Sequence, residues 1–96
     1  MNTFKVSIVT PERIVFEGDV VYLYVPGGGG TMGILANHAP LLASLTPGII
    51  ELRPQEPAKS IFLKIQKTGF IEVLKNNVSI LLDAADSFAI PVVPAS

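Results

Sequence analysis

The 96-residue sequence contains no cysteine and no tryptophan, and only 16% of its residues are charged. Without cysteine the chain has no disulfide framework, no thiolate nucleophile and no cysteine-ligated metal. The charged share lies below the usual value of about 25%, while 49% of the residues are hydrophobic. A small domain of this composition must leave apolar atoms on its surface, and large apolar patches usually mark contacts with other proteins.

Long hydrophobic runs and an excess of one charge are also missing. The longest apolar run is Val20–Val25, far short of the roughly 20 residues that cross a bilayer. The apolar residues near the N-terminus are interrupted by Lys5 and Ser7 and are followed by Pro11, so they do not form a signal peptide. The net charge of −1 argues against nucleic-acid binding and against a polybasic membrane anchor.

Hydrophobic residues alternate with polar ones along most of the chain, with the period of two that a half-buried strand requires. Turn residues recur at about every tenth position, and Pro26-Gly27 and Pro47-Gly48 each suit a type II turn. The pattern predicts an all-β fold, a two-sheet β-sandwich of about eight to ten short strands. The inner faces are expected to include Val6, Ile8, Val21, Leu23, Ile50, Leu63, Ile65, Val78 and Ile80.

Only one segment is a candidate helix, Asn37–Leu45. Pro40 suits the first turn of a helix, but Ala39 precedes that proline and therefore favours an extended backbone. The chain shows no repeats and no linker, so we expect one domain over residues 1–86. Residues 87–96, which include Pro91 and Pro94, are expected to form a short C-terminal tail.

The segment Gly28–Gly33 matches the dinucleotide-binding pattern G-x-G-x-x-G and follows an expected strand. That pattern binds pyrophosphate only where the glycine turn opens a helix within a βαβ unit. Here Pro40 comes seven positions after the last glycine and no βαβ unit surrounds the motif. The sequence therefore favours a flexible glycine loop that joins two strands, and it predicts no nucleotide site.

The candidate catalytic and metal-binding residues are few. His38 is the only histidine, and neither a nucleophile elbow nor oxyanion donors accompany a pairing with Ser44, so a structural role is favoured over a triad. Asp83 and Asp86 lie three positions apart, but two carboxylates alone make a poor metal site, and a cap or turn is favoured. We expect no catalytic residue, no cofactor and no bound metal.

Four segments in order resemble a known family. They are T-P-E-R-I-V-F-E-G (Thr10–Gly18), V-P-G-G-G-G-T-M-G-I-L-A-N-H-A-P-L-L (Val25–Leu42), L-T-P-G-I-I-E-L-R (Leu45–Arg53) and G-F-I-E-V-L-K-N-N-V-S-I-L-L-D-A-A (Gly69–Ala85). Together they resemble the N-terminal domain of the epsilon subunit of the F-type ATP synthase. The resemblance covers about residues 3–86, and the central stretch, a glycine loop followed by G-I-L and H-A-P-L-L, is its most specific part.

The resemblance implies a flattened two-sheet β-sandwich in the rotating central stalk. A domain of this family is a non-catalytic subunit that binds the gamma subunit and the ring of c subunits, with the alpha/beta head an indirect partner. It couples proton- or sodium-driven rotation to ATP synthesis. The implied location is peripheral to the membrane, on the cytoplasmic face of the bacterial inner membrane. No nucleic acid takes part.

The resemblance also assigns partner contacts to particular residues. The loop that faces the c-ring corresponds to Gly27, Gly28, Gly29, Gly30, Thr31, Met32 and Gly33. The segment near gamma corresponds to His38, Pro40, Leu41 and Leu42.

Two departures from the family pattern matter. The ring-facing loop often carries acidic residues in relatives, whereas here it has none, so we expect no charge pairing with a basic ring loop. Bacterial relatives usually continue into a helical hairpin that inhibits hydrolysis, whereas this sequence ends in A-I-P-V-V-P-A-S. We therefore expect no inhibitory hairpin and no ATP sensing.

The alternative function is a stand-alone β-sandwich binding module for a carbohydrate or a peptide. Such a module needs an aromatic platform or groove. With 7% aromatic residues the sequence predicts none.

Overall fold

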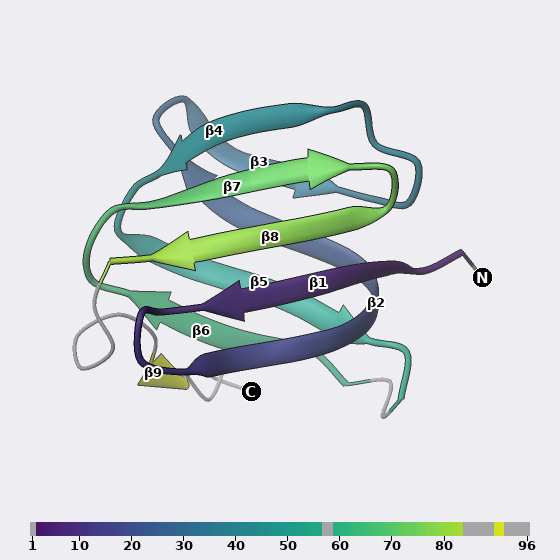
Figure 1. Ribbon diagram of the computed structural model, residues 1–96, viewed down its shortest axis with the longest axis horizontal. Coiled ribbons are helices and arrows are strands. Elements are labelled where there is room, and N and C mark those ends of the chain that lie inside the picture. The colour runs from purple at the N-terminus through teal and green to yellow at the C-terminus, as the bar shows by residue number, and fades with distance from the viewer. Residues whose placement is uncertain (1, 57–58, 84–89, 92–96) are drawn as a thin grey trace.

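The computed structural model describes residues 2–56, 59–83 and 90–91, and every regular element in these ranges is a strand (Figure 1). No helix occurs in the described ranges, and accordingly none is long and apolar enough to span a membrane. The all-β prediction is confirmed. The strands are β1 (Phe4–Val9), β2 (Ile14–Gly27), β3 (Gly30–Ile34), β4 (Leu41–Leu45), β5 (Gly48–Pro54), β6 (Ile61–Ile65), β7 (Gly69–Leu74), β8 (Asn77–Leu82) and β9 (Ile90–Pro91).

The strands form two layers that share the long strand β2. One layer contains β4, β7, β8 and β1 in that order, and β1 continues it to the first half of β2. The second half of β2 pairs with β3 and β5, and β6 and β9 extend this layer behind the first (Figure 1). β1 and β8 are parallel, and the other paired strands are antiparallel. Because β2 passes from one layer to the other, the sandwich is one continuous hydrogen-bonded sheet folded onto itself.

The core lies between the layers and consists of branched aliphatic side chains from almost every strand. Of the residues predicted to face inward, all except Val21 are buried. The prediction for Val21 is wrong, because the pairing of β2 with β5 shifts register between Val20 and Tyr22. This bulge turns Val20 into the core and Val21 outward, while Leu23 and Val25 keep their inward positions.

Two predicted turns are also wrong. Pro26 and Gly27 belong to β2 and pair with Thr31 and Gly30 of β3, so the turn lies at residues 28–29. Gly48 begins β5, and Gly30 is the only glycine in the described ranges with a positive φ. A type II turn at residues 47–48 would require a positive φ at Gly48.

The connection of β7 to β8 turns at Lys75 and Asn76, one residue earlier than the asparagine pair suggested. Their φ angles are 51° and 62°, the left-handed values that a tight type I′ hairpin needs at both central positions. The candidate helix at residues 37–45 is a turn followed by β4. The extended backbone favoured by Ala39-Pro40 is therefore what the structure has.

The tail expected at residues 87–96 lies outside the described residues except for Ile90 and Pro91. These two form β9, which pairs with Leu63 and Lys64 of β6. The expected absence of an inhibitory hairpin also concerns this part of the chain and stays a prediction.

Replacing Ile80 by alanine is expected to lower the free energy of unfolding by about 2–4 kcal/mol, because its side chain is fully buried between the layers. Leu81, the next residue on β8, is 53% exposed and provides the matched control. Its replacement by alanine should cost less than about 1 kcal/mol. Urea unfolding of both variants checks the assignment of faces, and equal losses would contradict it.

Candidate functional site

The segment predicted to face the c-ring forms the β2–β3 hairpin. Gly27 and Gly30 pair across the two strands, and residues 28–29 are the turn between them. Of the predicted seven residues, Gly27 therefore belongs to β2, and Gly30, Thr31, Met32 and Gly33 belong to β3. The expectation of a flexible loop is wrong, because strand pairing extends to the last residue before the turn.

The hairpin tip is thin and fully accessible. A Cβ added at Gly28 or Gly29 would meet no atom within 4 Å, whereas Gly30 has a φ of 118° that disfavours any side chain. Met32 closes the base of the tip, since a Cβ on Gly27 would lie 3.1 Å from its Cε atom. The tip can thus bring bare backbone close to another surface.

His38 lies in the connection between β3 and β4. Its backbone N–H donates to the carbonyl oxygen of Leu35 at 3.2 Å, and its Nδ1 lies 2.7 Å from the carbonyl oxygen of Ala39. The preceding residue, Asn37, has a left-handed φ of 67°. The ring is thus held within its own turn, as a structural histidine would be.

The other residues predicted near gamma differ in accessibility. Pro40 is exposed, Leu41 packs partly against the core, and Leu42 is 75% exposed on the outer face of β4. β3 separates this segment from the hairpin, so the tip and the His38 turn lie at opposite ends of the sandwich (Figure 1). The structure therefore does not bring the two predicted sites together.

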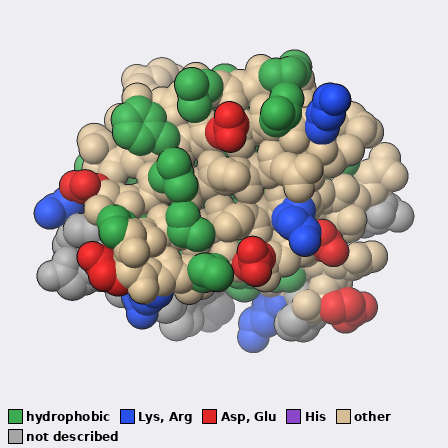
Figure 2. All heavy atoms as spheres, in the orientation of Figure 1, with side chains coloured by type: hydrophobic (Ala, Val, Ile, Leu, Met, Phe, Trp, Pro, Cys, Tyr) green, Lys and Arg blue, Asp and Glu red, His purple; other side chains and the backbone are tan. Residues whose placement is uncertain are grey.

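A row of exposed hydrophobic side chains crosses the outer face of the first layer, and the sequence prediction missed it. Phe70 pairs with Leu81, Leu81 with Val9, and Val9 with Ile14. Phe70, Leu81 and Ile14 are each more than half exposed. Figure 2 views this face and shows hydrophobic side chains gathered in a band across the strands. We call these four residues the apolar row.

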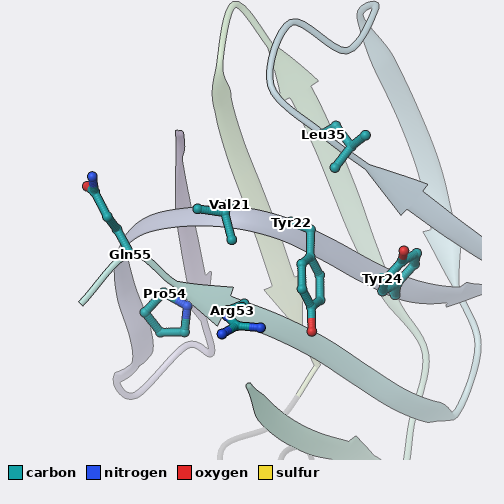
Figure 3. Close-up of a pocket in the computed structure, with 7 residues that line it drawn as sticks. All are labelled: Val21, Tyr22, Tyr24, Leu35, Arg53, Pro54 and Gln55. Atoms are coloured by element: carbon teal, nitrogen blue, oxygen red, sulfur yellow. The ribbon is translucent and has the colours of Figure 1, made fainter. Parts of the chain in front are cut away.

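The outer face of the second layer has a groove of about 550 Å³ (Figure 3). The rings of Tyr22 and Tyr24, with centroids 5.2 Å apart, stand on one side of it. A Cβ on Gly33 would lie 3.0 Å from Tyr24 Cε1, so the missing side chain lets that ring lie on β3. The prediction of no aromatic groove is wrong. The groove is lined by Val21, Tyr22, Tyr24, Leu35, Arg53, Pro54 and Gln55.

The Tyr22 hydroxyl links β2 to β5 and to the residue that precedes β6. It donates to Glu51 Oε2 at 2.6 Å, and it lies 2.6 Å from Ser60 Oγ. The hydrogen bond to the Glu51 carboxylate raises the pKa of Tyr22 above its ordinary value of 10.0, because only the protonated hydroxyl can donate that bond. These bonds hold the ring in place.

Within the described ranges, no group of three or more histidine, aspartate or glutamate side chains is placed to hold a metal ion. Asp83 is exposed after β8, and its expected companion Asp86 lies outside the described residues.

Residues 3–87 match the family model of the ATP synthase delta/epsilon chain β-sandwich domain. The ATP synthase epsilon chain of Leptospira borgpetersenii is 50% identical over 82 residues, which cover 85% of this chain and 62% of that protein. The epsilon chain of Pelotomaculum thermopropionicum is 45% identical over 85 residues, which cover 88% and 61%. The chain thus spans about three fifths of the length of these curated relatives.

Solved structures also share the fold. A chain in the cryo-EM structure of the Euglena gracilis mitochondrial ATP synthase, which contains OSCP, F1 and the c-ring, superposes with a TM-score of 0.77 at 24% identity. The match covers 93% of this chain and 53% of that one. At this identity the likeness shows the fold alone.

Proposed function

Because the chain belongs to the family of the ATP synthase delta/epsilon chain β-sandwich domain, we propose that it is a non-catalytic subunit of the central stalk of an F-type ATP synthase. In this role it binds the gamma subunit and the c-ring, and it reaches the alpha/beta head only indirectly. It transmits the ion-driven rotation of the ring to the stalk. As part of the complex it is peripheral to the membrane, at the cytoplasmic face in a bacterium.

The observation that carries the proposal is the apolar row on the outer face of β7, β8, β1 and β2. Four neighbouring strands each contribute one hydrophobic side chain at the same level, which yields a continuous apolar strip. An isolated domain gains nothing from such a strip, whereas a partner that covers it removes apolar area from water. We assign this face to gamma. Leu42 on β4 extends the face toward the His38 turn.

Charged side chains border the strip instead of interrupting it. Glu72 pairs with Leu42 and Ser79, and Glu17 pairs with Ser7. These residues form the next row of cross-strand pairs beside the apolar row. Protein interfaces commonly have an apolar centre and a polar rim. The face has this arrangement.

We assign the c-ring contact to the hairpin tip at residues 28–29. The tip has no charged side chain, so its contact with the ring depends on shape and backbone polar groups. The narrow cross-section of a glycine turn supports close approach to short ring loops. Thr31 is exposed beside the tip and provides the nearest hydroxyl.

A stand-alone binding module is the second candidate function, and the groove of Tyr22 and Tyr24 is the observation that favours it. Fixed aromatic faces beside a concave apolar surface can hold a small ligand or a peptide. The family match over residues 3–87 favours the stalk subunit.

The test is equilibrium binding of the 96-residue chain to a head assembly that contains gamma and lacks its epsilon chain. One-to-one binding with a Kd below about 1 μM is expected for an apolar interface of standard size. No binding at about 50 μM, 50-fold above that expected Kd, would reject the proposal.

A further inference from the structure

Two asparagines join distant turns at the end of the sandwich that carries His38. The backbone N–H of Asn37 donates to Asn76 Oδ1 at 2.6 Å, and Asn76 Nδ2 donates to Asn37 Oδ1 at 3.1 Å. The residues are 39 positions apart. Their φ angles of 67° and 62° are left-handed values that asparagine tolerates better than most residues. We call this pair the asparagine clasp.

The clasp fixes the β3–β4 connection to the first layer. Asn76 is anchored there because its carbonyl oxygen accepts the backbone N–H of Lys5 at 2.9 Å. The hydrogen bonds of His38, by contrast, go to Leu35 and Ala39 within the connection itself. They set the shape of the turn, while the clasp sets its position relative to β1 and β8.

We propose that Asn37 and Asn76 are positioning residues for partner binding, holding the His38 turn in the orientation that gamma contacts. This inference rests on the proposed function. A connection that is already fixed loses less conformational freedom when a partner binds. Neither residue needs to touch the partner. The sequence offered no signal for the pair, because Asn37 lies in the connection between β3 and β4, whereas Asn76 lies in the turn between β7 and β8.

Aspartate substitutions test the hydrogen bonds of the clasp, because the single variants control for the added negative charge. In Asn37→Asp the new carboxylate still accepts from Asn76 Nδ2. In Asn76→Asp the carboxylate still accepts from the Asn37 N–H, and the Asn37 amide can rotate to donate to the second oxygen. The double variant places two carboxylates against each other at pH 7 and has no side-chain donor. The one bond that remains possible, from the residue 37 N–H to the carboxylate at position 76, is opposed by the repulsion between the two carboxylates, so this variant weakens the clasp most.

The expected result is a difference between the single variants and the double variant. Each single variant should bind the gamma-containing head within about threefold of the unmodified chain, and the double variant about tenfold more weakly. Amide exchange at residue 37 should quicken about tenfold in the double variant alone. The urea midpoint of the double variant should fall far less than that of Ile80→Ala, because both sites are exposed.

A glycine pair repeats the test without charge. Asn76→Gly keeps the left-handed turn and removes both clasp bonds, while Lys75→Gly changes the other central residue of the same turn, at a φ of 51°. Only Asn76→Gly should quicken exchange at residue 37 and weaken head binding.

Leu81→Asp, measured in parallel, distinguishes a failure of the gamma-face assignment from a failure of the positioning role of the clasp. If Leu81→Asp leaves head binding unchanged, the assignment of the gamma face fails. If Leu81→Asp weakens binding while the double aspartate variant and Asn76→Gly do not, the clasp has no positioning role. Unchanged exchange at residue 37 in both clasp variants would overturn the inference without reference to any partner.

Discussion

Replacing Leu81 by aspartate is expected to weaken binding of the gamma-containing head about a hundredfold or more while leaving the sandwich folded. Leu81 is 53% exposed in the chain alone, so a carboxylate there stays hydrated. In the complex it would lie under gamma at the centre of the apolar row, where burial of an unpaired charge costs several kcal/mol. Each 1.4 kcal/mol is about a factor of ten in affinity. Calorimetry or surface-based binding measurements can follow the change.

Ile49→Asp is the matched control for this variant. Ile49 is 43% exposed on β5, on the outer face of the other layer, and it lies outside the His38 turn, so its replacement should change head affinity less than about threefold. An equal loss in Ile49→Asp would mean that the contact is not confined to the apolar row. A loss in Ile49→Asp alone would place gamma on the outer face of the second layer.

Replacing both Gly28 and Gly29 by phenylalanine is expected to reduce ion-driven ATP synthesis about fivefold or more. Neither position has a positive φ, and neither has a neighbour within 4 Å of an added Cβ, so the fold should tolerate the change. The two rings would hold the tip away from the c-ring and disturb a contact that depends on close backbone approach. Synthesis is measured in vesicles with the reconstituted complex, alongside ATP hydrolysis by the detached head.

Serine at the same two positions provides the control for losing the glycines without adding bulk. It should retain most of the synthesis activity, and both variants should bind gamma like the unmodified chain. If the phenylalanine variant couples normally, the tip is only a connector between β2 and β3. If it loses gamma binding as well, the hairpin and the apolar row are not separate contacts.

The alternation of the sequence predicted the core of most strands because one face of each is buried. It failed at Val21, where a bulge adds one residue to β2 and reverses the face of every residue before it. A run such as Val20–Val25, apolar at every position, contains no polar residue that would mark the bulge. Only the pairing with β5 decides which side chains turn inward.

The sequence could predict which segments contribute to the candidate site, but it could not predict which of their side chains lie next to each other. The residues of the apolar row lie on four strands, and they become neighbours through the register of β7, β8, β1 and β2. One local signal was present. Val9 interrupts the alternation of β1, and Leu81 lies between two buried residues of β8, so each places an apolar side chain on the polar face. The groove beside Tyr22 likewise depends on how β2, β3 and β5 are paired.

The most direct test of the central claim uses the absence of cysteine from the chain. Leu81→Cys and Ile49→Cys each introduce a single exposed thiol, one on the apolar row and one on the outer face of the other layer, and maleimide labelling rates report the access to each. When the chain is bound to the gamma-containing head, labelling of the Leu81→Cys variant should slow about tenfold or more, and labelling of the Ile49→Cys variant should not change. Equal labelling of the Leu81→Cys variant with and without the head, under conditions where binding is complete, would contradict the account.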